Sequence, residues 1–258
     1  DPTMRLERNP ETGQIVLWCM GEAHVDVVLD RLKARYGVNV DSEPLRVSLR
    51  ETFTGPAKGH GRLVKQSGGH GQYAVCDIEV EPLPPGSGFE FVDRVVGGAV
   101  PRQFIPSVEK GVRAQMAKGV VAGYPVVDIR VTLVDGKAHS VDSSDMAFQM
   151  AGGLALKEAA AAAHVSLLEP VDEVVVLVPD EYVGAVMSDL SGRRGRVTGS
   201  EGVGAGRTKI TAEVPGLELT RYAIDLRSLA HGTATFTRHY RGHEAMPAQV
   251  AQGLASTG

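Results

Sequence analysis

The order of strand and helix patterns in the last third of the chain constrains the fold more than any other feature of the sequence. Four predicted strands and two predicted helices follow one another there, at residues 171–178, 181–190, 196–201, 208–214, 219–229 and 234–240. This β-α-β-β-α-β order is typical of a ferredoxin-like domain. We therefore expect a complete domain of that kind over residues 170–247.

The opening of the chain repeats the second half of the same plan. Residues 4–8 and 15–20 predict a β-hairpin, and apolar residues at helical spacing predict a helix over 22–36. A further strand is predicted at 45–50. This β-β-α-β order lacks the first strand and helix of a ferredoxin-like unit, so we expect residues 1–53 to be a partial domain.

Strands and helices are mixed in the middle of the chain. Strand patterns occur at 63–66, 72–80, 89–92 and 126–134, and helix patterns at 107–118 and 144–163. The mixture predicts an α+β domain over residues 54–169. Small polar residues at 248–258 predict a frayed tail.

Composition and missing motifs limit the function. The net charge of −4 argues against a chain that is basic throughout, so any contact with RNA must come from local patches. The two cysteines, Cys19 and Cys76, lie in apolar runs and predict reduced thiols without a disulfide framework. The sequence holds no G-x-x-x-x-G-K-[ST], H-E-x-x-H or C-x-x-C motif, so we expect no catalytic centre, metal site or cofactor site in this chain. No apolar run reaches the roughly 20 residues of a membrane helix, and we expect a cytoplasmic protein.

A glycine-rich loop at residues 67–71 is the first candidate site. Three glycines in five residues let backbone amides approach a surface closely, and such amides can meet RNA phosphates. Lys65 and His70 add hydrogen-bond donors. The alternative interpretation is an ordinary flexible hairpin turn.

The second candidate is the segment 139–144, between a strand end and a helix start. Free amides and partial positive charge at a helix start favour a phosphate. Helix capping by Asp142 or Ser143 is an additional interpretation, and Asp142 and Asp145 would repel phosphate, so His139 and Ser140 are favoured for RNA. A Ser-His-Asp hydrolase is a weaker alternative, because neither a positioned base nor an oxyanion hole is indicated.

A third candidate is the run of Arg193, Arg194 and Arg196, which follows a predicted helix. Three arginines in four residues suit phosphate contact. A solvated helix C-terminus, favoured by the helix dipole, explains them equally well.

Seven stretches, taken together and in order, resemble elongation factor G from residue 1 to about residue 247. They read CMGEAHVDVVLDRLK, KQSGGHGQYAV, EPLPPGSGFEF, VVGGAVPRQFIPSVEKGV, GYPVVDIRVTLVDG, HSVDSSDMAFQMAGGLALKEA and LSGRRGRVTG. The resemblance implies the end of a third domain, a fourth domain folded as a ribosomal protein S5 domain 2-like arm, and a ferredoxin-like fifth domain. It also implies a GTPase domain elsewhere in the parent protein, which would bind the GTP and magnesium.

The resemblance implies a cytoplasmic, monomeric, ribosome-binding factor without a membrane segment. Its fourth domain would enter the decoding site, where transfer RNA and messenger RNA move together, and its fifth would contact large-subunit RNA. The implied RNA- and ribosome-binding residues are Ser67, Gly68, Gly69, His70, Gly71, Gln72, Tyr73, His139, Ser140, Val141, Asp142, Ser143, Arg193 and Arg194. Gly21, Glu22 and His24 would relay between the GTPase domain and the ribosome.

The sequence departs from the family pattern in or beside the two loops that the resemblance implies for RNA binding. His70 stands where the family usually has arginine, Ala74 where it has glycine, and Ser140 where an acid is usual. A histidine gives a weaker, pH-sensitive phosphate contact than a guanidinium. The departures favour a paralogue, and ribosome recycling or loss of translocation is the second hypothesis. A tetracycline-type ribosome protection factor shares the architecture but ranks below both.

Overall fold

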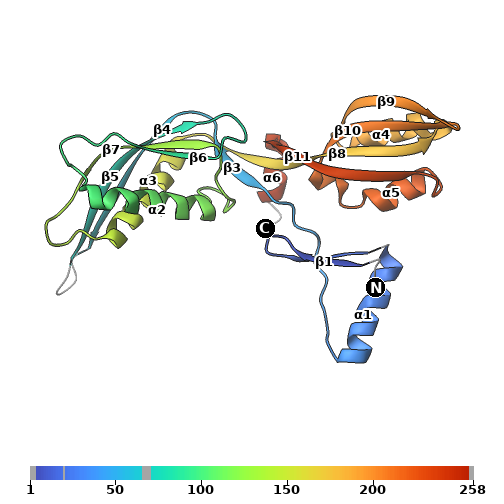
Figure 1. Ribbon diagram of the computed structural model, residues 1–258, viewed down its shortest axis with the longest axis horizontal. Helices are drawn as coiled ribbons and strands as arrows, with labels where there is room; N and C mark the ends of the chain where they lie inside the picture. Colours follow the sequence, from blue (N-terminus) through green and yellow to red (C-terminus); the bar gives the residue numbers. More distant parts are fainter. Residues whose placement is uncertain (1–3, 20, 66–70, 256–258) are drawn as a thin grey trace.

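The computed structural model describes residues 4–19, 21–65 and 71–255. Three parts follow one another along the chain (Figure 1): an opening hairpin with its helix, a four-stranded sheet covered by two helices, and a closing sheet with helices of its own. This arrangement confirms the α+β class. No helix in the described part of the chain is long and apolar enough to cross a membrane.

The opening part consists of strands β1 (Arg5–Arg8) and β2 (Ile15–Trp18) and helix α1 (Glu22–Tyr36). The two strands pair antiparallel, and Gly37, with φ of 67°, ends the helix in the left-handed conformation that glycine adopts readily. No residue of α1 is buried.

The strand predicted at 45–50 is wrong. Residues 37–49 form no helix or strand, and the strand β3 lies at Arg50–Phe53. It pairs antiparallel with residues 165–168 of a later strand and not with the opening hairpin. The reason is burial: Phe53 packs into the core of the middle domain, which the hairpin cannot offer.

The middle domain holds strands β4 (Ala57–Lys65), β5 (Gln72–Pro82), β6 (Phe89–Asp93) and β7 (Ile129–Lys137), in the order β4-β5-β7-β6. Only the β6–β7 pair is parallel. A short 3₁₀ turn (Arg102–Phe104) leads into helix α2 (Ile105–Lys118), and α3 (Asp145–Ala162) follows β7.

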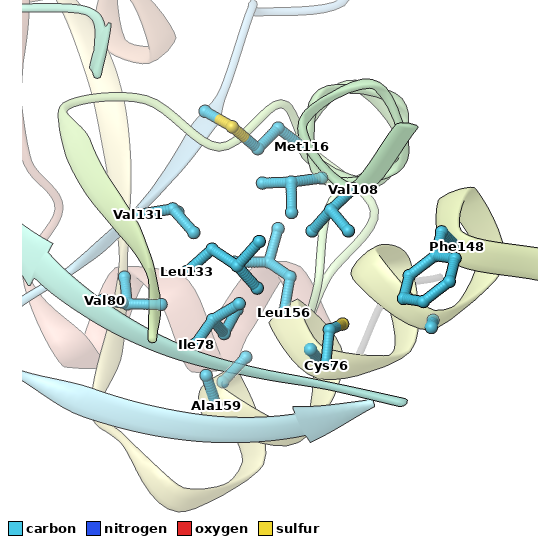
Figure 2. Close-up of a cluster of buried hydrophobic side chains, with 14 of the residues drawn as sticks. Cys76, Ile78, Val80, Val108, Met116, Val131, Leu133, Phe148, Leu156 and Ala159 are labelled. Atoms are coloured by element: carbon cyan, nitrogen blue, oxygen red, sulfur yellow. The ribbon is translucent and has the colours of Figure 1, made fainter. Parts of the chain in front are cut away.

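Both helices pack their apolar sides on one face of this sheet. Figure 2 shows Ile78, Val80 and Leu133 of the strands facing Leu156 and Ala159 of α3, with Val108 and Met116 of α2 beside them. Burial raises the pKa of the Cys76 thiol in this core to about 12, which keeps it protonated and unreactive.

Glycines let β4 and α3 approach closely. A Cβ atom at Gly61 would lie 1.9 Å from the carbonyl oxygen of Ala151, and one at Gly59 would lie 1.9 Å from that of Ala155. The helix is therefore held on the sheet by backbone-to-backbone contact that no larger residue permits.

The closing domain contains β8 (Val165–Pro179), α4 (Val183–Gly192), β9 (Arg196–Gly204), β10 (Arg207–Pro215), α5 (Tyr222–Leu229) and β11 (Thr235–Ala245). Short 3₁₀ turns at Asp180–Tyr182 and Gly216–Leu219 precede the helices. The sheet order β11-β8-β10-β9, with all neighbours antiparallel, confirms the ferredoxin-like prediction. The long strand β8 pairs with β3 at its start and with β10 further along.

The predicted frayed tail is partly wrong. Residues Ala248–Ala255 form helix α6. Alanine, glutamine and leucine favour helix, and the chain leaves β11 through Pro247, which suits the first turn of a helix.

Candidate functional site

The two candidate loops of the middle domain meet at one end of its sheet. Strand β4 ends there at Lys65, β5 begins there at Gln72, and β7 ends there at Lys137 before the chain enters the segment 139–144. Ser67, Gly68, Gly69 and His70 lie outside the described residues. Gly71, Gln72 and Tyr73 are described, and we call them, with residues 139–144, the tip.

Hydrogen bonds fasten the two sides of the tip together. The Tyr73 N–H donates to the carbonyl of Asp142 over 2.9 Å, and the Ser143 hydroxyl donates to the carbonyl of Tyr73 over 2.7 Å. At Gly71, a Cβ atom would lie 2.8 Å from the Asp142 carboxyl carbon. The tip is therefore one packed unit, and glycine at position 71 is what lets the Asp142 side chain lie against the backbone.

His139 is oriented by the backbone of its own loop. Its Nδ1 accepts hydrogen bonds from the N–H groups of Val141 and Asp142, at 3.3 and 3.2 Å. Since Nδ1 accepts, the ring proton of the neutral imidazole sits on Nε2, which makes that atom a donor. The side chain is 50% exposed, so this donor is available to a ligand at the surface.

Two further groups shape the surroundings of His139. The Tyr73 ring lies with its centroid 6.1 Å from that of the imidazole. The Asp142 carboxylate lies 3.4 Å from Nδ1. Ser140 and Val141 are exposed beside them.

The N-cap of helix α3 lies one or two residues after the predicted position. Helix α3 is capped by Ser144, whose hydroxyl accepts from the Ala147 N–H over 3.1 Å, and not by Asp142 or Ser143. Asp145 accepts a hydrogen bond from the Ser107 hydroxyl of α2 instead, at 2.7 Å. Asp142 and Ser143 are thereby left to join the two loops.

These contacts also weigh against the hydrolase alternative. The Ser143 hydroxyl accepts from the backbone N–H of His139 and donates to the Tyr73 carbonyl, and His139 Nδ1 is occupied by backbone amides. A nucleophile needs a base in hydrogen-bond reach that can take its proton. Neither group has that arrangement here.

Arg193 and Arg194 are engaged within the closing domain. The Arg193 guanidinium bonds to Asp189 at 2.9 Å and to Asp225 at 2.7 Å. Burial opposes its charge, but these hydrogen bonds raise its pKa. Asp189 lies four positions before Arg193, a local helix pairing, but no local pattern in the sequence indicates Asp225, which lies 32 positions away.

Arg194 forms a two-pronged ion pair with a buried carboxylate. It contacts the two oxygens of Glu169 at 2.6 and 2.9 Å and also Glu218 at 2.8 Å. The hydrogen bonds to Glu169 raise its pKa further. Such forked pairs fix geometry strongly, so both arginines serve the fold, and RNA contact by either stays a prediction.

Gly21, Glu22 and His24 lie together at the start of α1, far from the tip (Figure 1). The Gly21 carbonyl accepts from the N–H of His24 at 3.0 Å. Their predicted relay role concerns parts outside this chain and stays a prediction. In the described residues, no group of three or more His, Cys, Asp or Glu side chains could hold a metal ion.

Comparison with known proteins gives a family for each part of the chain. Residues 1–44 match the family model for Elongation Factor G, domain III, residues 45–164 match Elongation factor G, domain IV, and residues 166–254 match the Elongation factor G C-terminus. The chain belongs to the elongation factor G family. The three matches follow the order that the seven sequence stretches predicted.

Individual relatives of this elongation factor G family member agree. The Elongation factor G-like protein of Mycobacterium tuberculosis (strain CDC 1551 / Oshkosh) is 75% identical over 97% of this chain, and Elongation factor G of Aquifex pyrophilus is 49% identical over 98%. A crystal structure of a Thermus thermophilus protein matches all of the chain with a TM-score of 0.88 and 40% identity. This chain spans 35% and 36% of the length of those two relatives, and 38% of that crystallised chain.

Proposed function

We propose that this chain is the ribosome-contacting arm of a translation elongation factor G that promotes GTP-dependent movement of transfer RNA and messenger RNA. The tip would enter the decoding site of the small subunit, and the closing domain would contact large-subunit RNA. The chain itself has no catalytic role in this proposal. GTP and magnesium would bind a GTPase domain elsewhere in the parent protein, which would act in the cytoplasm as a monomer.

The joined tip is the observation that carries the proposal. Two loops far apart in sequence are fastened by Tyr73, Asp142 and Ser143. They lie where β4 ends and β5 begins, at one end of an elongated molecule (Figure 1), and the His139 side chain among them is half exposed. A rigid donor at the end of an arm can follow RNA phosphates or sugars without rearrangement. This is the geometry that a lever acting on RNA needs.

The test is tRNA–mRNA movement on ribosomes, driven by the full-length factor. His139→Ala removes the donor and leaves the Tyr73–Asp142 and Ser143–Tyr73 bonds in place. We expect an intact circular dichroism spectrum and movement slowed by about 5- to 30-fold, the effect of losing about one or two kcal/mol of hydrogen bonding. Movement at the rate of the unaltered factor would refute a role for the tip.

A second candidate is a paralogue that acts in ribosome recycling or lacks translocation activity. It is favoured by 75% identity to a protein named Elongation factor G-like, and by His70 and Ser140 at positions where the family pattern differs. Measuring ribosome-stimulated GTP hydrolysis and movement separately decides between the two. GTP hydrolysis without movement, with movement restored in part by His70→Arg, would favour the paralogue.

A further inference from the structure

In the described part of the chain, the helices of the middle domain cover only one face of its sheet. Helices α2 and α3 lie on that face, so the side chains of His60, Arg62, Asp77 and Lys137 project from the opposite one, which we call the open face. Cross-strand pairing arranges the open face in rows. His60 pairs with Asp77, and Arg62 pairs with Val75, which pairs in turn with Lys137.

Charges far from the tip on this face are neutralised by neighbours. Lys58 lies 3.3 Å from the Glu79 carboxylate, and Arg130 lies 2.8 Å from that of Glu90. His60 Nδ1 lies 2.6 Å from Asp77. Cross-strand pairs of this kind are an ordinary solvated sheet surface.

The row of Arg62, Val75 and Lys137 differs. Arg62 and Lys137 are both exposed, and neither has an ion pair with any residue that the structure describes. The next row holds two acids: Asp77 lies 2.6 Å from His60 Nδ1, and Asp135 accepts a hydrogen bond from the Gly136 N–H. Two cations therefore flank Val75 without the carboxylate partners that the other rows have.

An aromatic ring adjoins these cations. Tyr73, which belongs to the tip, lies on the same face in the adjacent row, where it pairs with Val64 across the strands. It is partly exposed, and its ring lies beside that of His139. Cations beside an accessible ring are the combination that binds unpaired RNA, through phosphate contact and base stacking.

We propose that the open face next to the tip is a second RNA-contacting surface, in which Arg62 and Lys137 bind phosphates and Tyr73 stacks on an unpaired base. The proposal rests on the proposed function for its choice of RNA over another anion. It extends the RNA site from the loops onto the strands: the family resemblance already implies Tyr73 as an RNA-binding residue, whereas no sequence motif indicates Arg62 or Lys137. The surface is rigid, because its residues lie on hydrogen-bonded strands.

The test measures binding of the 258-residue chain to a uridine RNA of about 12 nucleotides, as a function of salt. Each lost phosphate contact lowers the slope of log affinity against log salt by about 0.7 for single strands. The double variant Arg62→Gln, Lys137→Gln should therefore lower the slope by about 1.4. The matched control, Lys110→Gln with Lys157→Gln, removes the same charge from the exposed sides of α2 and α3 and should leave the slope unchanged.

The ring is tested separately from the charges. Tyr73→Leu should lower the affinity about tenfold at every salt concentration without changing the slope, and Tyr73→Phe should behave as the unaltered chain. Absence of RNA binding by the unaltered chain at about 50 mM salt would contradict the proposed RNA-contacting surface. Equal slopes in the test and control double variants would overturn it as well.

Failure of this surface is distinguishable from failure of the proposed function. If His139→Ala slows movement on the ribosome but the Arg62, Lys137 double variant binds RNA normally, the function stands and the open face is only a solvated surface. If the double variant loses RNA binding while the His139→Ala factor moves tRNA at the normal rate, the RNA-contacting surface is supported and the proposed role of the tip is refuted.

Discussion

At the scale of single residues, the most demanding feature is a buried carboxylate, Glu51. It is fully buried and accepts hydrogen bonds from the backbone N–H groups of Val120, Val121, Ala122 and Tyr124, at 2.7 to 3.0 Å. Converging amides form a nest that favours an anion. Glu51 thus ties strand β3 to the loop that leads into β7.

Glu51→Gln should destabilise the chain by about 2–4 kcal/mol, because the amide NH₂ group of glutamine faces backbone donors that it cannot satisfy. Urea unfolding followed by circular dichroism measures this. Glu90→Gln, which changes an exposed carboxylate of the neighbouring sheet edge, should cost less than about 1 kcal/mol. Equal losses in the two variants would contradict the account of the nest.

Some contacts of single residues can be predicted from the sequence alone, and others cannot. The candidate loops and His139 follow from local composition and spacing, because glycine, serine and aspartate mark turns and helix starts. The partners of Arg194 do not, since Glu169 and Glu218 come from elements 25 and 24 positions away. A run of arginines has the same pattern whether it faces RNA or carboxylates.

At the scale of elements, close approach of β4 to α3 holds the arm together. Gly61→Ala would place a methyl group 1.9 Å from the Ala151 carbonyl oxygen and force the helix off the sheet. We expect a loss of about 3 kcal/mol, at the upper end of overpacking effects, measured by thermal or urea unfolding. Gly55→Ala is the control, because nothing lies within 4 Å of its added Cβ atom and the effect should be near zero. A stable Gly61→Ala variant would show that α3 can shift at little cost.

Helices and strands are predicted well where apolar residues recur at a regular spacing. They are predicted poorly where pairing with a distant strand decides which residues form the strand. The helices and the closing sheet follow from apolar spacing that local residues determine. The apolar alternation of Leu45, Val47 and Leu49 predicts a strand, yet the strand begins at Arg50. The partner decides the register: β8 offers an edge to 50–53, and Phe53 fills the middle core.

At the scale of the whole molecule, a histidine joins the closing domain to residues 37–49, the segment that connects the opening part to the middle domain. His243 of β11 is hydrogen-bonded through Nε2 to the Ser48 carbonyl at 2.7 Å and through Nδ1 to the Tyr240 hydroxyl at 2.6 Å. Burial lowers its pKa, outweighing the hydrogen bond to Ser48. Arg50, Glu11 and Asp128 are the charged groups that also act on it.

A lowered pKa has a definite consequence for stability. The unfolded chain takes up the proton first, so the contribution of His243 is complete above the ordinary histidine pKa of about 6.5 and is lost as the pH falls through the lowered value. Urea unfolding should show that the free energy of unfolding decreases as the pH is lowered from about 7 to about 5. The His243→Gln variant should show a weaker dependence on pH. The same slope in both proteins would assign the pH effect to other groups.

In the proposed function, the tip of the middle domain lies against small-subunit decoding RNA. The direct measurement places an iron chelate on a cysteine at position 141, where Val141 is 74% exposed, in the full-length factor bound to ribosomes, and maps RNA cleavage by hydroxyl radicals. Position 203 in β9, 50% exposed, is the matched position on the closing domain. We predict cleavage of decoding-site RNA from position 141 and of large-subunit RNA from position 203. Cleavage of decoding-site RNA from position 203, or none from position 141, would contradict the account.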